Sequence, residues 1–173
     1  MSRQQITPGS FTVIDHDDGT SSEVEAHIEF MRLAIMQAEI AAPTTNAFST
    51  GVFLVKGKYP ISEGRSNESK LNLHAAAHAI AKAQQGNNRH MVPGSTLYTT
   101  MEPCSSERVS KVPCTKYIID AGIKTVVIGV KEPDSFFDCN GVKTMCAAGI
   151  NVIHLLILQE ECLKPNIHLL MDN

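Results

Sequence analysis

Apolar residues recur every three or four positions between Ser22 and Pro43. That spacing places them along one face of an α-helix. Ser22 and Glu25 have the Ser-x-x-Glu spacing of a capping box, and Pro43 disfavours helical backbone in the residue before it. The pattern therefore predicts an amphipathic helix that starts at Ser22 and ends before Pro43. Its apolar face consists of Val24, Ile28, Met31, Ile35 and Ala38.

The rest of the chain alternates between short apolar runs and segments of helical composition. Runs rich in β-branched and aliphatic residues predict strands, and Gly57-Lys58 offers the turn of a hairpin. Alanine-rich or glycine-terminated segments between these runs predict helices. The predicted strands are 51–55, 59–62, 95–100, 125–130 and one within 150–158, and the predicted helices are 74–85, 113–121, 140–148 and, limited by Pro165, 160–170.

This order of elements predicts an α/β fold. A hairpin followed by strand–helix alternation favours a mixed sheet of about five strands with helices on both faces, a three-layer α/β/α sandwich. Residues 1–21 are polar and contain Pro8 and Gly9, and we interpret them as a flexible N-terminal arm with little regular structure. We expect residues 22–173 to form a single domain, which fits the usual domain size.

Composition excludes several classes of protein. Hydrophobic residues make up 43% of the chain and charged residues 19%, so a disordered chain is excluded. The 15 Lys and Arg against 18 Asp and Glu give a net charge of −3, and nucleic-acid-binding surfaces are basic. The longest apolar runs, such as 152–158, are shorter than the roughly 20 residues that span a bilayer. We therefore expect neither nucleic-acid nor membrane partners.

The cysteines indicate a reducing compartment. Their number, five, is odd, and the first residues lack the apolar core of a signal peptide. We therefore expect free thiols and a cytoplasmic or nuclear location. Cys139, Cys146 and Cys162 are interpreted as small core residues.

His74, Cys104 and Cys114 are the strongest candidates for chemistry. One imidazole and two thiolates leave the fourth position of a tetrahedral zinc ion open for water, as in catalytic zinc sites. Cys114 follows Pro113 at a predicted helix start, where the helix dipole favours a thiolate. Two alternatives stay open: a closed structural zinc site or buried thiols, and a metal shared by His74 and His78, which stand four residues apart on a helix.

These residues resemble the signature of zinc-dependent nucleobase deaminases, His-x-Glu followed by Pro-Cys and a second cysteine. The matching strings here are His74-Ala75-Ala76 and Pro103-Cys104-x9-Cys114. The long interval between the cysteines is similar to that of the pyrimidine deaminases of riboflavin biosynthesis. The strings 97–105, 129–134 and 148–152 resemble the fungal branch in the same order, and the resemblance covers about residues 22–160.

The resemblance implies a cytidine-deaminase-like fold, a zinc cofactor and a homodimer. It also places Ala76 where the family has its proton-shuttling glutamate. A methyl group transfers no proton, so we expect the chain as given to be catalytically inactive. An engineered variant and a natural pseudo-enzyme are both compatible with Ala76, and we favour the first because the rest of the motif is intact.

The fungal resemblance implies a substrate, 2,5-diamino-6-ribitylamino-4(3H)-pyrimidinone 5′-phosphate. Asn46 aligns with a family asparagine that contacts the ribose or ribityl chain, and Glu102 either braces the site or contacts the base. We expect Ser106 and Arg108, in the loop between the cysteines, to bind the phosphate, because the guanidinium fork suits phosphate. Arg65 and Lys111 are alternative phosphate ligands.

Two other functions stay open. A tRNA or nucleoside deaminase would share the zinc ligands, although the charge and the cysteine spacing argue against it. A non-catalytic pseudo-deaminase would keep zinc and a ligand pocket as a binding module, and restoring a carboxylate at position 76 would then give no deamination.

Overall fold

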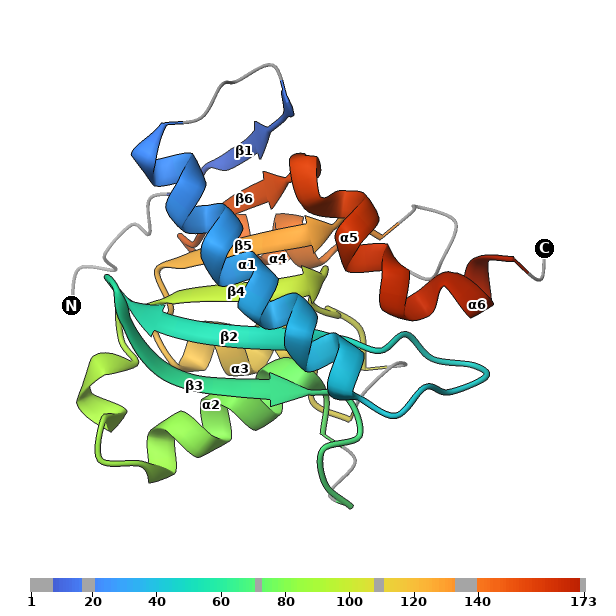
Figure 1. The fold of residues 1–173 in the computed structure, drawn as a ribbon. Helices are drawn as coiled ribbons and strands as arrows, with labels where there is room; N and C mark the ends of the chain where they lie inside the picture. The colour runs from blue at the N-terminus through green and yellow to red at the C-terminus, as the bar shows by residue number, and fades with distance from the viewer. Residues whose placement is uncertain (1–7, 17–20, 71–72, 108–110, 133–139, 172–173) are drawn as a thin grey trace.

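The structure is a computed structural model that describes residues 8–16, 21–70, 73–107, 111–132 and 140–171 (Figure 1). Its centre is a mixed six-stranded sheet in the order β1-β6-β5-β4-β2-β3. Strands β1, β6, β5 and β4 are parallel, whereas β2 runs antiparallel to both β4 and β3. The strands are β1 (Phe11–Ile14), β2 (Gly51–Lys56), β3 (Tyr59–Arg65), β4 (Thr96–Met101), β5 (Thr125–Val130) and β6 (Asn151–Leu155).

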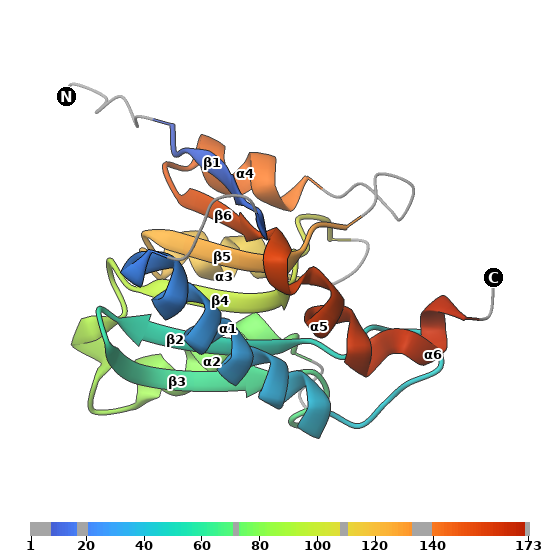
Figure 2. The same ribbon diagram turned by 45° about the horizontal axis from the view of Figure 1, so that its top comes forward.

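Helices cover both faces of the sheet, which confirms the three-layer prediction (Figures 1 and 2). Helices α1 and α5 lie on one face, and α2, α3 and α4 lie on the other. Short 3-10 turns and α6 complete the helical elements among the described residues. The bounds are α1 (Ser22–Ile40), α2 (Ala75–Gln85), α3 (Cys114–Asp120), α4 (Gly141–Ala147), α5 (Gln159–Leu163), α6 (Ile167–Leu170), η2 (Arg89–Met91), η3 (Leu156–Leu158) and η4 (Lys164–Asn166).

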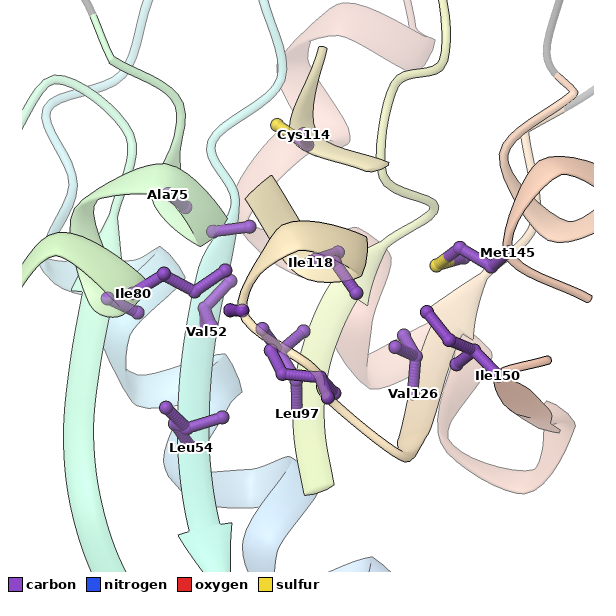
Figure 3. Packing of buried hydrophobic residues seen from close by; sticks show 14 of the residues in the cluster. Val52, Leu54, Ala75, Ile80, Leu97, Cys114, Ile118, Val126, Met145 and Ile150 are labelled. Carbon is purple, nitrogen blue, oxygen red and sulfur yellow. The ribbon is translucent and has the colours of Figure 1, made fainter. Parts of the chain in front are cut away.

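Each face of the sheet has its own hydrophobic core, because successive strand residues point to opposite faces. On β5, Val126 packs in the cluster beneath α2, α3 and α4, and Val127 packs in the cluster beneath α1 and α5. Figure 3 shows the first cluster, in which Ala75 and Cys114 lie at one end. The hydrophobic core beneath α2 and α3 therefore extends to residues at the starts of both helices.

The predicted amphipathic helix is confirmed, but its cap is one residue earlier than expected. Val24, Met31 and Ile35 are buried along α1. The Ser21 side chain, rather than that of Ser22, accepts the hydrogen bond from the Val24 N–H at 3.3 Å. Two adjacent serines offer the same cap chemistry, so the sequence alone did not distinguish them.

The first strand was missed, and it raises the strand number from about five to six. Residues 11–14 belong to the segment interpreted as an irregular arm, yet β1 pairs in parallel with β6 at the sheet edge. Phe11 and Val13 stay 44% and 45% exposed, and Ile14 alone of the four residues is half-buried against the core, so the segment is too short and too exposed for its pattern to indicate a strand. Residues 1–7 and 17–20 of the predicted arm lie outside the described residues.

The segment predicted as one last helix is divided. Helix α5 ends at Leu163, and η4, which contains Pro165, separates it from α6. Among the helices that the structure describes, none combines the length and the apolar character needed to cross a membrane.

Gly64 on β3 gives a test of how α2 is seated. A Cβ added there would lie 2.3 Å from the Ala75 carbonyl oxygen and 2.7 Å from the Ala79 nitrogen, both backbone atoms of α2. We expect Gly64→Ala to lower the free energy of unfolding by about 1–3 kcal/mol, the usual effect of overpacking, in urea titrations. Gly86→Ala is the matched control, because its Cβ would meet its nearest atoms at ordinary contact distances of 3.4 and 3.6 Å. Equal stabilities of the two variants would contradict this close approach.

Candidate metal centre

Three side chains from three segments meet beyond the carboxyl end of β4. His74 is the N-cap residue of α2, and Cys114 is the first residue of α3. Cys104 lies in the segment that follows β4, between Glu102 and α3. In α/β sheets, ligands bind outside the carboxyl ends of the strands, and this group lies there.

The three side chains are close enough to share one metal ion. His74 Nδ1 lies 3.4 Å from the sulfur of Cys104 and 3.4 Å from that of Cys114. One ligand atom from each residue lies within 4.8 Å of the others. Cys114 is buried, whereas His74 and Cys104 are half-buried. A catalytic metal site needs protein ligands on one side and an open side from which a substrate can reach the metal, and this group has both.

Cys104 also holds the start of α3. Its sulfur accepts the Cys114 N–H at 3.3 Å, and its carbonyl accepts the Thr115 N–H at 3.1 Å. These two N–H groups belong to the first turn of α3, where helical N–H groups have no partner within the helix. The same residue therefore positions the backbone and the side chain of Cys114.

The contact between the two thiols moves their pKa values in opposite directions. The hydrogen bond with the Cys114 thiol, helped by His74, lowers the pKa of Cys104 to about 4 despite its burial. The same contact and burial raise the pKa of the Cys114 thiol, and the bond to Cys104 raises the pKa of His74. Because metal ligands must be deprotonated, we expect metal binding to release protons.

His78 lies one turn further along α2 and is not part of this group. It is buried, its Nε2 lies 3.5 Å from the Ser69 hydroxyl, and burial lowers its pKa. This is the environment of a packed helix residue, so the structure gives no support to a metal shared by His74 and His78 alone.

Ala76, the second residue of α2, is also buried, with 4% of its surface exposed. Its methyl group belongs to the hydrophobic cluster beneath the helices. The side chain supplies packing next to His74 and has no group that accepts a proton.

Glu102 braces the segment that carries Cys104. The side chain is buried, its Oε1 accepts the Val142 N–H at 2.9 Å and its Oε2 accepts the Glu132 N–H at 3.1 Å. Burial raises the pKa of this carboxyl, although both hydrogen bonds oppose the rise. Of the two roles expected for Glu102, the structure shows the contacts of a brace, and contact with a base stays a prediction.

The partners of Glu102 were not found from the sequence. Val142 lies 40 residues from Glu102, and backbone N–H groups carry no sequence signal. The glycine at position 141 was a partial signal in the sequence. A Cβ at this position would lie 2.2 Å from the Pro103 carbonyl oxygen. Only glycine permits α4 to approach the Pro103-Cys104 segment so closely.

The other predicted ligand-binding residues are placed less completely. Asn46 is exposed in the loop before β2, and Ser106 is half-buried two residues after Cys104. Arg108 lies outside the described residues. Among the alternatives, Lys111 is exposed, and Arg65 donates from Nη1 to Gln37 Oε1 at 3.2 Å. Their contacts with a substrate stay predictions.

Glu102→Gln tests the brace. An amide can accept only one of the two N–H bonds and turns its own NH₂ group toward the other donor. We expect the free energy of unfolding to fall by about 1–3 kcal/mol, as for a buried donor left unsatisfied, in urea titrations. Glu107→Gln, at an exposed position of the same segment, should change it by less than about 0.5 kcal/mol. A Glu102→Gln protein as stable as the parent would show that the carboxylate is not needed to hold α4.

The chain matches known proteins over most of its length. Residues 24–130 match the family model described as the cytidine and deoxycytidylate deaminase zinc-binding region. The diaminohydroxyphosphoribosylamino-pyrimidine deaminase of Schizosaccharomyces pombe is 40% identical over 138 residues, which cover 80% of this chain and 34% of the relative. The protein of the same name from Buchnera aphidicola is 31% identical, with 79% of this chain and 88% of the relative covered.

Solved structures agree with the fold. The crystal structure of Aspergillus oryzae Rib2 deaminase in complex with DARIPP superimposes with a TM-score of 0.68 at 26% identity, covering 80% of this chain and 88% of that one. The chain spans about a third of the length of several relatives, 34% for those from S. pombe, Actinobacillus pleuropneumoniae and Escherichia coli. Together with the His/Cys/Cys group, these matches show that the chain belongs to the cytidine and deoxycytidylate deaminase zinc-binding family, within its diaminohydroxyphosphoribosylamino-pyrimidine deaminase branch.

Proposed function

We propose that this chain is a zinc-dependent pyrimidine deaminase domain of riboflavin biosynthesis. The proposed reaction replaces the 2-amino group of 2,5-diamino-6-ribitylamino-4(3H)-pyrimidinone 5′-phosphate by oxygen and releases ammonia. The observation that carries the proposal is the His74, Cys104 and Cys114 group in a chain of this family. The relative solved with DARIPP supports a ligand of this class.

Zinc fits the ligand spacing. A tetrahedral zinc ion with bonds of about 2.3 Å to sulfur and about 2.0 Å to nitrogen separates a sulfur and a nitrogen ligand by roughly 3.5 Å. Both sulfurs lie 3.4 Å from His74 Nδ1. We therefore assign His74, Cys104 and Cys114 as the zinc ligands.

The roles of the protein groups follow from this assignment. Zinc held by three protein ligands supplies a water of lowered pKa for attack on the ring carbon that carries the amine. Glu102 fixes the segment that bears Cys104, and Asn46, Ser106 and Arg108 are proposed to contact the sugar and phosphate. Proton transfer to the ring and to the leaving amine needs a carboxylate, which Ala76 does not provide.

We therefore propose that the chain as given binds substrate without converting it. General acid–base groups contribute about 10²–10⁴-fold to rates, so a loss of at least this size is expected. A second candidate function is a non-catalytic binding module. It is favoured by Ala76, whose side chain contributes to the core while the His/Cys/Cys group stays assembled.

Further proposals concern organisation. We propose that residues 22–173 form one deaminase domain and that the protein is a homodimer, as the resemblance implies. The thiol ligands require reduction, which supports a cytoplasmic setting.

Removal of one ligand should abolish zinc binding. We expect about one zinc per chain in the parent and less than about a tenth of that in Cys104→Ser, because three protein ligands hold the ion. Zinc content is measured by atomic emission on protein dialysed against a weak chelator. Cys146→Ser, which changes a half-buried thiol outside the group, should keep the full zinc content. Full zinc content in Cys104→Ser would overturn the ligand assignment.

Restoring the carboxylate should restore chemistry. We expect Ala76→Glu to release ammonia from the diaminopyrimidinone ribityl phosphate at least about 10²-fold faster than the chain as given, at equal zinc content. Ala76→Gln is the matched control, because glutamine has the same shape without an ionisable acid. If Ala76→Glu binds zinc and substrate but releases no ammonia, the binding module is the better description.

The same assay separates the substrates. Turnover of the ribosylamino phosphate in preference to the ribitylamino phosphate would correct the substrate while keeping the reaction. Turnover of cytidine or of a tRNA substrate alone would favour the nucleoside or tRNA deaminase alternative.

A further inference from the structure

We propose that Asn166 and His168 are positioning residues that hold the Thr44–Ser49 loop in the conformation that binds substrate. This inference rests on the proposed function, in which Asn46 of this loop contacts the sugar chain. Asn46 is exposed in this loop. The loop lies beside α6 in both views (Figures 1 and 2).

Asn166 holds one end of the loop. Its side chain is completely buried, and it makes both hydrogen bonds that a neighbouring strand would make to Ser49. The Ser49 N–H donates to Asn166 Oδ1 at 2.6 Å, and Asn166 Nδ2 donates to the Ser49 carbonyl at 2.9 Å. A buried amide with both groups satisfied fixes the backbone of Ser49, because no water competes for these bonds.

His168 holds the other end. Its Nε2 lies 2.8 Å from the Thr44 carbonyl oxygen, which can only accept, so the ring nitrogen donates. The Thr44 hydroxyl closes the turn itself, donating to the Ala47 carbonyl at 2.6 Å and accepting the Ala47 N–H at 2.9 Å. Asn46 is therefore presented on a closed turn whose first residue is fixed by His168.

The held loop leads into β2, which pairs with β4, the strand that precedes Glu102 and Cys104. Val52 pairs with Thr99, and the Gly51 N–H donates to the Thr100 hydroxyl at 3.1 Å. Glu102 and Cys104 follow Thr100 by two and four residues. The contacts of Asn166 and His168 thus act on a segment at the same end of the sheet as the His/Cys/Cys group.

The apparent Kd equals the intrinsic Kd divided by the fraction of molecules in which the loop holds this conformation, so a loop that leaves it more often binds more weakly. Loss of the His168 hydrogen bond should therefore raise the Kd for the diaminopyrimidinone ribityl phosphate about three- to tenfold. The KM should rise by the same factor in the Ala76→Glu background, with kcat changed by less than about twofold, because the reacting groups are untouched.

His168→Ala is the test variant, because His168 is exposed and its loss leaves no cavity. His168→Gln is the conservative variant, whose amide can still donate to the Thr44 carbonyl, and His90→Ala is an exposed histidine control on η2. Calorimetric titration of the chain as given measures Kd without turnover. Hydrogen exchange over residues 44–49 reports the loop directly, whatever the substrate.

We expect His168→Ala to raise Kd and KM and to speed exchange in the loop, and His168→Gln to restore both. An unchanged Kd and KM in His168→Ala, or equal effects in His90→Ala, would overturn the positioning role, even with faster exchange. A parent protein that neither binds the pyrimidine nor converts it after Ala76→Glu would overturn the proposed function itself. Exchange in the loop would then still decide whether His168 holds it.

Discussion

The contact between Cys104 and the first turn of α3 is the interaction on which the site depends. The sulfur and the carbonyl of Cys104 accept two N–H groups that a helix start leaves without partners. The thiol of Cys114 can therefore face that of Cys104 only while α3 begins where it does. His74 completes the group because it stands at the start of a second helix, α2. The site therefore forms only where the starts of α2 and α3 meet the segment that follows β4.

Much of this arrangement could be predicted from the sequence, because the signals are local. The apolar run of β5, the glycine after α2 and the proline before Cys114 each mark an element through its own residues. The group of His74, Cys104 and Cys114 was recognisable because one imidazole and two thiols suit a zinc ion, and because the strings around them resemble the deaminase signature. The structure brings these three residues together as expected.

The remainder could not be predicted, because its signals are not local. Strand β1 is held at an edge by backbone pairing with β6, and its side chains stay partly exposed. The partners of Glu102 are backbone N–H groups from two other segments. The burial of Asn166 and its contact with Ser49 could not be predicted, because burial of an amide depends on tertiary packing and a polar residue near a proline is usually exposed. Arg108 lies outside the described residues, so its predicted role is still untested.

The position of β1 has a consequence for how the chain folds during synthesis. Among the described strands, β1 pairs with β6 alone, which follows it by well over a hundred residues, and the Ser10–Asn151 contact joins residues 141 positions apart. Such distant pairing is slow, because a long loop must close before any contact is gained. Residues 11–14 therefore stay unpaired, with their apolar side chains exposed, until β6 has been synthesised. The first of the described strands to be synthesised is therefore among the last that can pair.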